Sequence, residues 1–291
     1  MGAGEGTVGA AVLERLGAQA AVLAELDDAV RADEPDAVHR MRVAGRRLRS
    51  ALRTYRRLFA AGVTDELVAE LRWLGSALGR ARDREVLGAR LAARARDLPD
   101  ACGPDRVAAE LERWGRAEYR RVWPEVLAAL DSPRRRALAD GLAALLDDPP
   151  LRRRAGRAAG AELARVAARE QRRTAERVQR ALDGGAGQDE ALHEARKAAK
   201  RARYAGETAV PVAGRAAERY VERMKAVQEV LGEHQDAVVA AAALRGQADA
   251  SGEAFGYGVL YGQELAAGEA ARRELPAVWR RAAKRKLARF G

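Results

Sequence analysis

Residues 38–59 read VHRMRVAGRRLRSALRTYRRLF, and this stretch decides which fold and which chemistry we expect. It holds eight arginines, one histidine and no acidic residue. Nothing inside it breaks a helix except Gly45, which a helix tolerates. On a helix, six cationic or ionisable side chains fall within an arc of about 80°: His39, Arg42, Arg46, Arg49, Arg53 and Arg57. The opposite face is apolar and predicted to be buried: Met41, Leu48, Leu52, Tyr55 and Phe59.

The basic face of this helix destabilises the helix itself. Like charges three or four residues apart cost about 0.2–0.5 kcal/mol per pair on an exposed helix, and such pairs follow one another from Arg42 to Arg57. An unmixed stripe, about 21 Å long from His39 to Arg53, therefore indicates a long anion as its partner. A merely solvated basic face remains the alternative.

The composition predicts an all-α protein with an anionic partner. Of 291 residues, 48% are hydrophobic and 33% are charged, which is typical of a globular chain that can form one large core or two ordinary ones. Aromatic residues make up only 4%. The formal net charge of +11 fits nucleic acid, a phosphorylated metabolite, a polyanion or a membrane surface, and does not choose among them.

Other features bear on location and cofactors. The single cysteine, Cys102, leaves no internal disulfide and no multi-cysteine metal site, and it fits a reducing compartment. The first residues lack the basic segment and apolar run of a signal peptide, and no apolar window of about 18 residues is free of charge. We expect a cytoplasmic protein with no membrane partner, no cofactor and no metal.

The sequence predicts a series of helices separated by short loops. Their ranges are 8–31, 37–60, 65–97, 104–130, 133–147, 151–182, 188–210, 212–231, 234–247 and 253–273, with a basic tail at the end. Asp36 is expected to cap the second helix, Gly79 to bend or interrupt the third, and Pro124 to kink or break the fourth. The sequence Asp148-Pro-Pro is the best candidate boundary between two units, 1–148 and 149–291.

The chain contains an internal repeat. HRMRVAGRRLR at 39–49 matches HEARKAAKRAR at 193–203, with histidine followed by basic residues at the same four later positions. A Leu-Gly-x-x-x-Asp segment follows each, at 78–83 and 231–236, with nearly the same separation. Two linked motifs repeated in this way predict two similar helical units, each a bundle of about four helices, related by a pseudo-twofold axis.

The second basic helix differs from the first in two ways. Glu207 stands where the first stripe has Arg53, and we expect it to pair with a neighbouring cation rather than to touch the anion. The apolar side consists of alanines, so another element has to approach it closely: Ala195, Ala199 and Ala202.

At these residues the sequence resembles the conserved-histidine α-helical domain family, abbreviated CHAD. The resemblance rests on His39–Arg49, His193–Glu207 and the two Leu-Gly-x-x-x-Asp segments, and it covers roughly residues 8–250. It implies an all-α fold of two four-helix bundles related by a pseudo-twofold axis, together one CHAD unit. It also implies binding of inorganic polyphosphate on a basic surface and pore, without catalysis, and association with polyphosphate granules.

The residues expected to bind polyphosphate lie in the repeated motifs. In the first unit they are His39, Arg42, Arg46, Arg47, Arg49, Arg53, Arg72 and Arg82. In the second unit they are His193, Arg196, Lys197, Lys200, Arg201, Arg203 and Lys225. Lys225 corresponds to Arg72 in the repeat, and Gln235 replaces the family's arginine at the position of Arg82.

Other roles for the motif residues stay open. His39 and His193 are interpreted as phosphate donors whose charge can change near neutral pH; packing at the helix start and metal ligation, with His234 and Asp236 nearby, are the alternatives. Asp83 and Asp236 are expected to cap a following helix or to hold an arginine of the stripe. A catalytic pair is less favoured because no nucleophile, P-loop or metal cluster accompanies them.

Three functional classes follow from this sequence. The favoured hypothesis is a non-enzymatic polyphosphate-binding protein, whose guanidinium groups pair with successive phosphates. A nonspecific nucleic-acid-binding protein would use the same charge, but the chain has no recognition motif and few aromatic residues for base stacking. A phosphohydrolase is the least favoured class. Chain-length preference and oligomeric state do not follow from the sequence.

Overall fold

The computed structural model describes residues 6–248, 251–284, 288 and 290. These residues form helices and turns, with no β-strand among them. The helices are α1 (Val8–Glu25), α2 (Asp27–Arg31), α3 (Ala37–Thr54), α4 (Val63–Arg96), α5 (Pro104–Asp131), α6 (Pro133–Asp147), α7 (Ala159–Asp183), α8 (Gln188–Ala248) and α9 (Ala254–Ala282). The predicted all-α fold class is confirmed.

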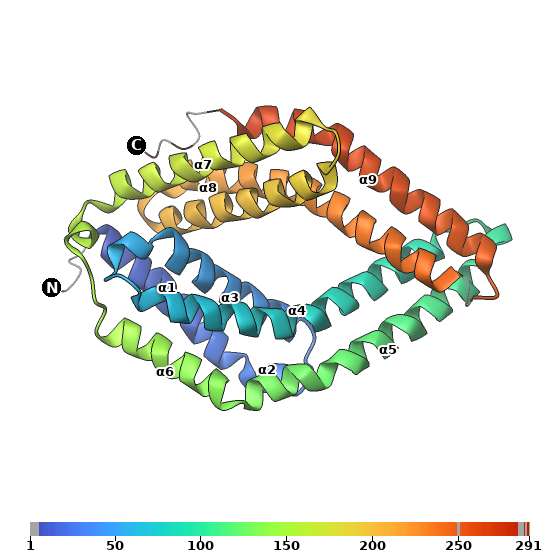
Figure 1. Ribbon diagram of the computed structural model, residues 1–291, viewed down its shortest axis with the longest axis horizontal. Helices are drawn as coiled ribbons and strands as arrows, with labels where there is room; N and C mark the ends of the chain where they lie inside the picture. Colours follow the sequence, from blue (N-terminus) through green and yellow to red (C-terminus); the bar gives the residue numbers. More distant parts are fainter. Residues whose placement is uncertain (1–5, 249–250, 285–287, 289, 291) are drawn as a thin grey trace.

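The helices form a packed base from which two arms extend (Figure 1). Helices α1, α3, α7 and the start of α8 contact one another in the base, on the left of the view. One arm is the hairpin of α4 and α5, and the other is the hairpin of the end of α8 with α9. The arms diverge from the base and come together again at their far ends on the right.

Helix α8 reverses its direction within one long element. The reversal occurs at Gly214, where φ is +49°, a conformation that residues with a Cβ rarely adopt. Residues 188–213 are called the N-terminal limb below, and residues 215–248 the C-terminal limb. The limbs are antiparallel. They pack so closely at Gly206 that a Cβ there would lie 2.6 Å from the Tyr220 ring.

Several predicted breaks between helices are wrong. Helix α4 passes Gly79 without interruption, α5 passes Pro124, and the C-terminal limb is continuous through 231–234. Pro211 also lies inside α8, three residues before the actual reversal. Inside a helix, a glycine is less favourable than an alanine by about 1 kcal/mol and a proline by about 3 kcal/mol. The packing of these long helices along the core outweighs these costs.

Other predicted helices are shorter than expected or begin at a different residue. The first predicted helix is divided at Leu26, the second ends at Thr54 before a 3-10 turn, and the sixth begins only at Ala159. Asp36 precedes α3 but does not cap it, because its φ is +63° and its side chain accepts no hydrogen bond from the helix. In the basic tail, Arg280, Arg281 and Lys284 are described, whereas Arg285, Lys286 and Arg289 lie outside the described residues.

Two apolar cores hold the molecule together. The larger core fills the base and includes residues from both predicted units, among them Met41 and Leu48 of α3 and Ala199 of α8. The smaller core lies where the arms meet, and its residues come from all four arm helices: Leu87, Leu91, Leu111, Leu244, Tyr257 and Leu260. The division of the chain at residue 148 stays a prediction.

We expect the α4–α5 arm to depend on a backbone contact between two glycines. A Cβ on Gly88 would lie 3.0 Å from the Gly115 Cα, and a Cβ on Gly115 would lie 2.9 Å from the Gly88 Cα. Gly88→Ala and Gly115→Ala should each lower the free energy of unfolding by about 1–3 kcal/mol, because the helices must separate. Urea unfolding followed by circular dichroism measures this.

Gly75→Ala is the matched control on the same helix. A Cβ on Gly75 would have no neighbour within 4 Å, so this substitution should raise the free energy of unfolding by about 0.5–1 kcal/mol through helix propensity alone. Equal effects at positions 75 and 88 would contradict the close helix contact.

Candidate functional site

The two predicted basic faces lie against each other in the base. Arg46 Nε of α3 donates a hydrogen bond to the Tyr204 hydroxyl of the N-terminal limb at 2.5 Å. The guanidinium groups of Arg46 and Arg203 also lie over the Tyr204 ring, 5.8 and 4.9 Å from its centre. The structure therefore joins stripes that are far apart in the sequence.

Lys200 lies on the N-terminal limb one helical turn before Tyr204, between Arg196 and Arg203. Burial, together with the positive charges of nearby arginines from both helices, lowers its pKa to about 7: Arg46, Arg196, Arg42 and Arg203. The Lys200 ammonium has no hydrogen-bond or ion-pair partner in the part of the chain that the structure describes. These five cations, Lys200 and its four arginines, are called the central cluster below.

Each Leu-Gly-x-x-x-Asp segment holds one arginine of the cluster. Arg42 Nη1 donates to Asp83 Oδ1 at 2.9 Å. A Cβ on Gly79 would lie 3.3 Å from Arg42 Nη2, so the glycine leaves room for the guanidinium to lie across α4. Asp83 lies one turn later and orients it. The expectation that Asp83 holds an arginine is confirmed, and the helix-cap alternative is wrong because Asp83 is inside α4.

The second segment repeats this arrangement less tightly. Arg196 Nη2 lies 4.0 Å from Asp236 Oδ1, and a Cβ on Gly232 would lie 3.4 Å from Arg196 Nη2. Arg196 Nε is buried without a hydrogen-bond partner among the described residues. Burial raises the pKa of Asp236, although the positive charge of Arg196 opposes this rise.

The two motif histidines have different surroundings. His39 is half-buried, and burial lowers its pKa, with the positive charge of Arg82 adding to the effect. Gln235 occupies the position of Arg82 in the second half. His193 Nδ1 lies 2.9 Å from the Gln235 side-chain oxygen Oε1. An amide oxygen only accepts hydrogen bonds, so His193 Nδ1 carries the proton in this contact. The replacement therefore exchanges a cation for a neutral acceptor.

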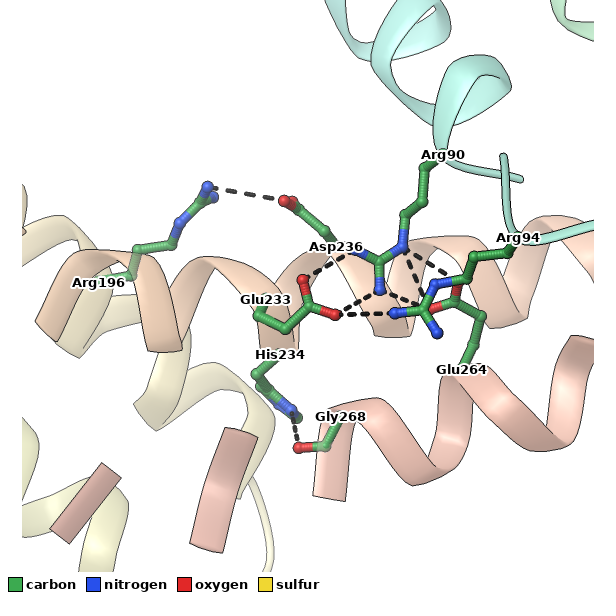
Figure 2. A network of polar contacts seen from close by, with 8 residues as sticks. All are labelled: Arg90, Arg94, Arg196, Glu233, His234, Asp236, Glu264 and Gly268. Carbon is green, nitrogen blue, oxygen red and sulfur yellow. Dashed lines mark hydrogen bonds and ion pairs between the residues drawn. The ribbon is translucent and has the colours of Figure 1, made fainter. Parts of the chain in front are cut away.

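His234 and Asp236 do not converge on one site. Figure 2 shows His234 turned towards Gly268 of α9, whereas Asp236 points away from it towards Arg196. His234 is buried, with Nδ1 3.3 Å from the Gly268 carbonyl oxygen and Nε2 3.2 Å from Asp189 Oδ1. Among the described residues, no three histidine, cysteine or acidic side chains are arranged to hold a metal ion.

Glu207 partly neutralises the edge of the central cluster. Its carboxylate lies 2.6 Å from Arg15 Nη2, 3.0 Å from Arg47 Nε and 3.4 Å from Arg203 Nε. The expectation that Glu207 pairs with neighbouring cations is confirmed. Arg15 comes from α1 and was not among the predicted site residues, because no basic pattern surrounds it in the sequence.

The other predicted site residues lie around the central cluster or apart from it. Burial lowers the pKa of Arg49, and the charges of Arg53, Arg72 and Arg46 lower it further. Arg46, Arg49 and Arg53 continue the row along α3, and Arg72 comes from α4. Four others have acidic neighbours of their own. Arg82 Nη1 lies 2.9 Å from Glu85 Oε1. Lys197 Nζ lies 2.7 Å from Glu194, Arg201 Nε lies 3.9 Å from Glu170, and exposed Lys225 lies 3.5 Å from Glu229.

Comparison with known families identifies the fold. The family model described as "CHAD domain" matches residues 14–245. The chain belongs to the CHAD domain family. This membership supports a polyphosphate-related function at the level of the family.

Two curated relatives come from Mycobacterium tuberculosis. They are "Uncharacterized protein MT2285" of strain CDC 1551 and "Uncharacterized protein Rv2226" of strain H37Rv. Each is 39% identical over 269 residues, which cover 88% of this chain and 50% of the relative. The chain therefore spans about half the length of the curated relatives that it matches.

Two solved structures share the fold over nearly the whole chain. "PptA from Streptomyces chartreusis" has a TM-score of 0.75 at 25% identity and covers 94% of this chain and 99% of its own. The CHAD domain from the plant Ricinus communis has a TM-score of 0.74 at 27% identity and covers 96% of this chain and 92% of its own.

An open cleft beside the cluster of this CHAD protein extends the basic surface. Its volume is about 410 Å³, and it is lined by Arg53, Thr54, Arg56, Glu170, Arg173, Glu176, Arg177, Glu194 and Arg201. Arg173 and Arg177 come from α7, where basic and acidic residues alternate. Because α7 carries both positive and negative side chains, its sequence gives no indication that it lines the site.

A second ionic network joins the two arms (Figure 2). Arg90 of α4 lies 2.6 Å from Glu233 of α8 and 2.7 Å from Glu264 of α9, and Arg94 lies 3.2 and 3.0 Å from the same carboxylates. Glu264 is fully buried, and hydrogen bonds with Glu233 raise the pKa of Arg90.

No helix among the described residues is long and apolar enough to span a membrane.

Glu207→Gln should destabilise the ligand-free protein. Removing this carboxylate leaves three arginines facing one another without an acid, so we expect a loss of about 1–3 kcal/mol in the free energy of unfolding. Glu229→Gln is the control, because Glu229 is exposed and paired only with exposed Lys225; its effect should stay within about 0.5 kcal/mol. Urea unfolding of both variants decides whether Glu207 compensates the cluster.

Proposed function

We propose that this CHAD-domain protein binds inorganic polyphosphate, without catalysis, along the cations of α3 and the N-terminal limb of α8. The observation that carries the proposal is the central cluster, where five cations from two helices share a half-buried junction. Like charges repel strongly when they are partly removed from water. A polyanion entering the junction would turn this repulsion into attraction, which supports a ligand with closely spaced negative charges.

The central cluster fits a thin, flexible polyanion better than a duplex. Its cations lie between two packed helices, and Tyr204, the aromatic ring beside them, is covered by guanidinium groups. Such a ring offers no free face for base stacking. A linear phosphate chain presents oxygen atoms that guanidinium groups can bind in pairs. Nucleic acid remains the alternative outcome of the competition experiment below.

We assign the binding residues different parts within this proposal. Arg42, Arg46, Arg196 and Lys200 form the centre. Arg49 and Arg53 extend it along α3, beside Arg72 of α4. His39, Arg82 and His193 flank the other end. Arg47 and Arg203 contact Glu207 and therefore mainly position their neighbours. Lys197, Arg201 and Lys225 have acidic partners and are assigned to the periphery. Granule association is proposed as a consequence of binding long chains.

Arg46→Glu should weaken binding of long-chain polyphosphate by about 30-fold or more, because it replaces a central cation by an anion. Without ligand, its melting temperature should stay unchanged or rise slightly, since like-charge repulsion is removed. Calorimetric titration of the full chain measures the affinity, and competition with DNA of equal phosphate count at two salt concentrations tests selectivity.

Arg120→Glu makes the same change of charge on an exposed part of α5 and should leave the affinity nearly unchanged. Equal loss in both variants would mean that only the overall charge matters. Equal competition by DNA would favour the nucleic-acid alternative.

The absence of catalysis is a separate proposal. Asp83 and Asp236 lie beside arginines that they orient, which leaves neither of them placed as a free base or nucleophile. We expect no phosphate release above background from polyphosphate, tripolyphosphate or ATP with Mg²⁺ or Mn²⁺. Turnover that disappears in Asp83→Ala or Asp236→Ala would contradict the non-enzymatic assignment.

A further inference from the structure

The central cluster contains one cation that can lose its charge and four that cannot. Arginine keeps its proton at every pH that a folded protein survives. Lysine has a lower ordinary pKa and releases its proton readily when it is buried. The repulsion within the cluster therefore decreases when Lys200 loses its proton, because the four arginines around it stay charged.

The acids on the elements around the central cluster are paired with other cations. From α4, Asp83 accepts from Arg42, and from the C-terminal limb, Asp236 lies beside Arg196. Glu207, on the same limb as Lys200, contacts Arg203 and also Arg15 of α1. From α7, the buried carboxylate of Glu170 lies within 3.2 Å of both Arg169 and Arg173. No described acid is in contact with the Lys200 ammonium.

We propose that Lys200 is neutral in the ligand-free protein at mildly alkaline pH and takes up a proton when a polyanion enters the central cluster. This deepens the proposed function, on which it rests, by making polyphosphate binding dependent on pH. Phosphate oxygens close to the amine favour its charged form, whereas burial and the four arginines disfavour it in the empty site. Protonation and binding therefore favour each other.

The pH range follows from the surroundings of Lys200. Burial and the neighbouring arginines lower its pKa to about 7 in the empty site, and bound phosphate should return it towards the ordinary value. Between these two values, one proton is taken up per binding event. Affinity should fall by up to about tenfold for each pH unit above 7. His39 titrates below this range because burial lowers its pKa.

The same argument predicts the stability of the empty protein. The unfolded chain binds a proton at Lys200 up to its ordinary pKa, whereas the folded chain loses it near pH 7. Between these values the unfolded state holds more protons, so the contribution of Lys200 to stability increases as pH rises. Lys200→Met removes this contribution. Its gain in melting temperature over the unsubstituted protein should be largest near pH 6 and shrink as pH rises.

Calorimetry of the full chain with long-chain polyphosphate tests the proposal directly. Titrations at about pH 8 in two buffers with different ionisation enthalpies should show uptake of about one proton per site. Lys200→Arg should bind with almost no uptake, because its guanidinium is already charged. The exposed control Lys284→Met should keep the full uptake. His39→Asn measures any share of the histidine, and titration of the ligand's own ends is equal in all variants.

The outcomes separate this proposal from the proposed function. Binding with equal heats in both buffers, or unchanged proton uptake in Lys200→Arg, overturns the role of Lys200 and leaves polyphosphate binding intact. Absence of binding in every buffer contradicts the proposed function and this proposal together. A pH-independent difference in melting temperature between Lys200→Met and the unsubstituted protein contradicts the neutral lysine without any ligand.

Discussion

The packing of two arginine-rich helices against each other is the constraint on which this structure depends. Bringing α3 next to the N-terminal limb of α8 places cations from both helices around Lys200 and costs repulsion. The opposite faces offset that cost by burying apolar side chains, including Met41 and Leu48 of α3. Alanines such as Ala199 keep the limb thin enough to enter the core. Glu207 then compensates one edge of the junction.

The glycine and aspartate of each repeated segment act together on one arginine. Gly79 costs helix propensity inside α4, yet its missing side chain is what allows the Arg42 guanidinium to lie across the helix. Asp83 then fixes the direction in which Arg42 points. The second half keeps the same geometry but exchanges Arg82 for Gln235, so its histidine faces a neutral amide. The two Leu-Gly-x-x-x-Asp segments therefore hold their arginines in a similar way and differ in charge.

The two ends of the arms differ in how far their positive charges are paired with acids. Where the arms meet, Arg90 and Arg94 are matched by Glu233 and Glu264, and the network closes between helices from different halves. Breaking such a buried network leaves an uncompensated charge and destabilises a protein strongly. At the base, Lys200 and its arginines lack enough acids. Compensated charge thus joins structural elements, and uncompensated charge is available to a ligand.

The all-α class, the basic and apolar faces of α3 and the repeated motifs could be predicted from the sequence, because helical periodicity and residue type are local properties. The sequence also indicated that Asp83 and Glu207 would hold cations. That helices continue past Gly79 and Pro124 depends on tertiary packing, because packing along a helix outweighs local propensity. The tertiary structure alone placed Arg42 and Arg46 beside Lys200 and brought Arg15 to Glu207, because contacts between distant helices depend on how their faces pack, which no local pattern encodes.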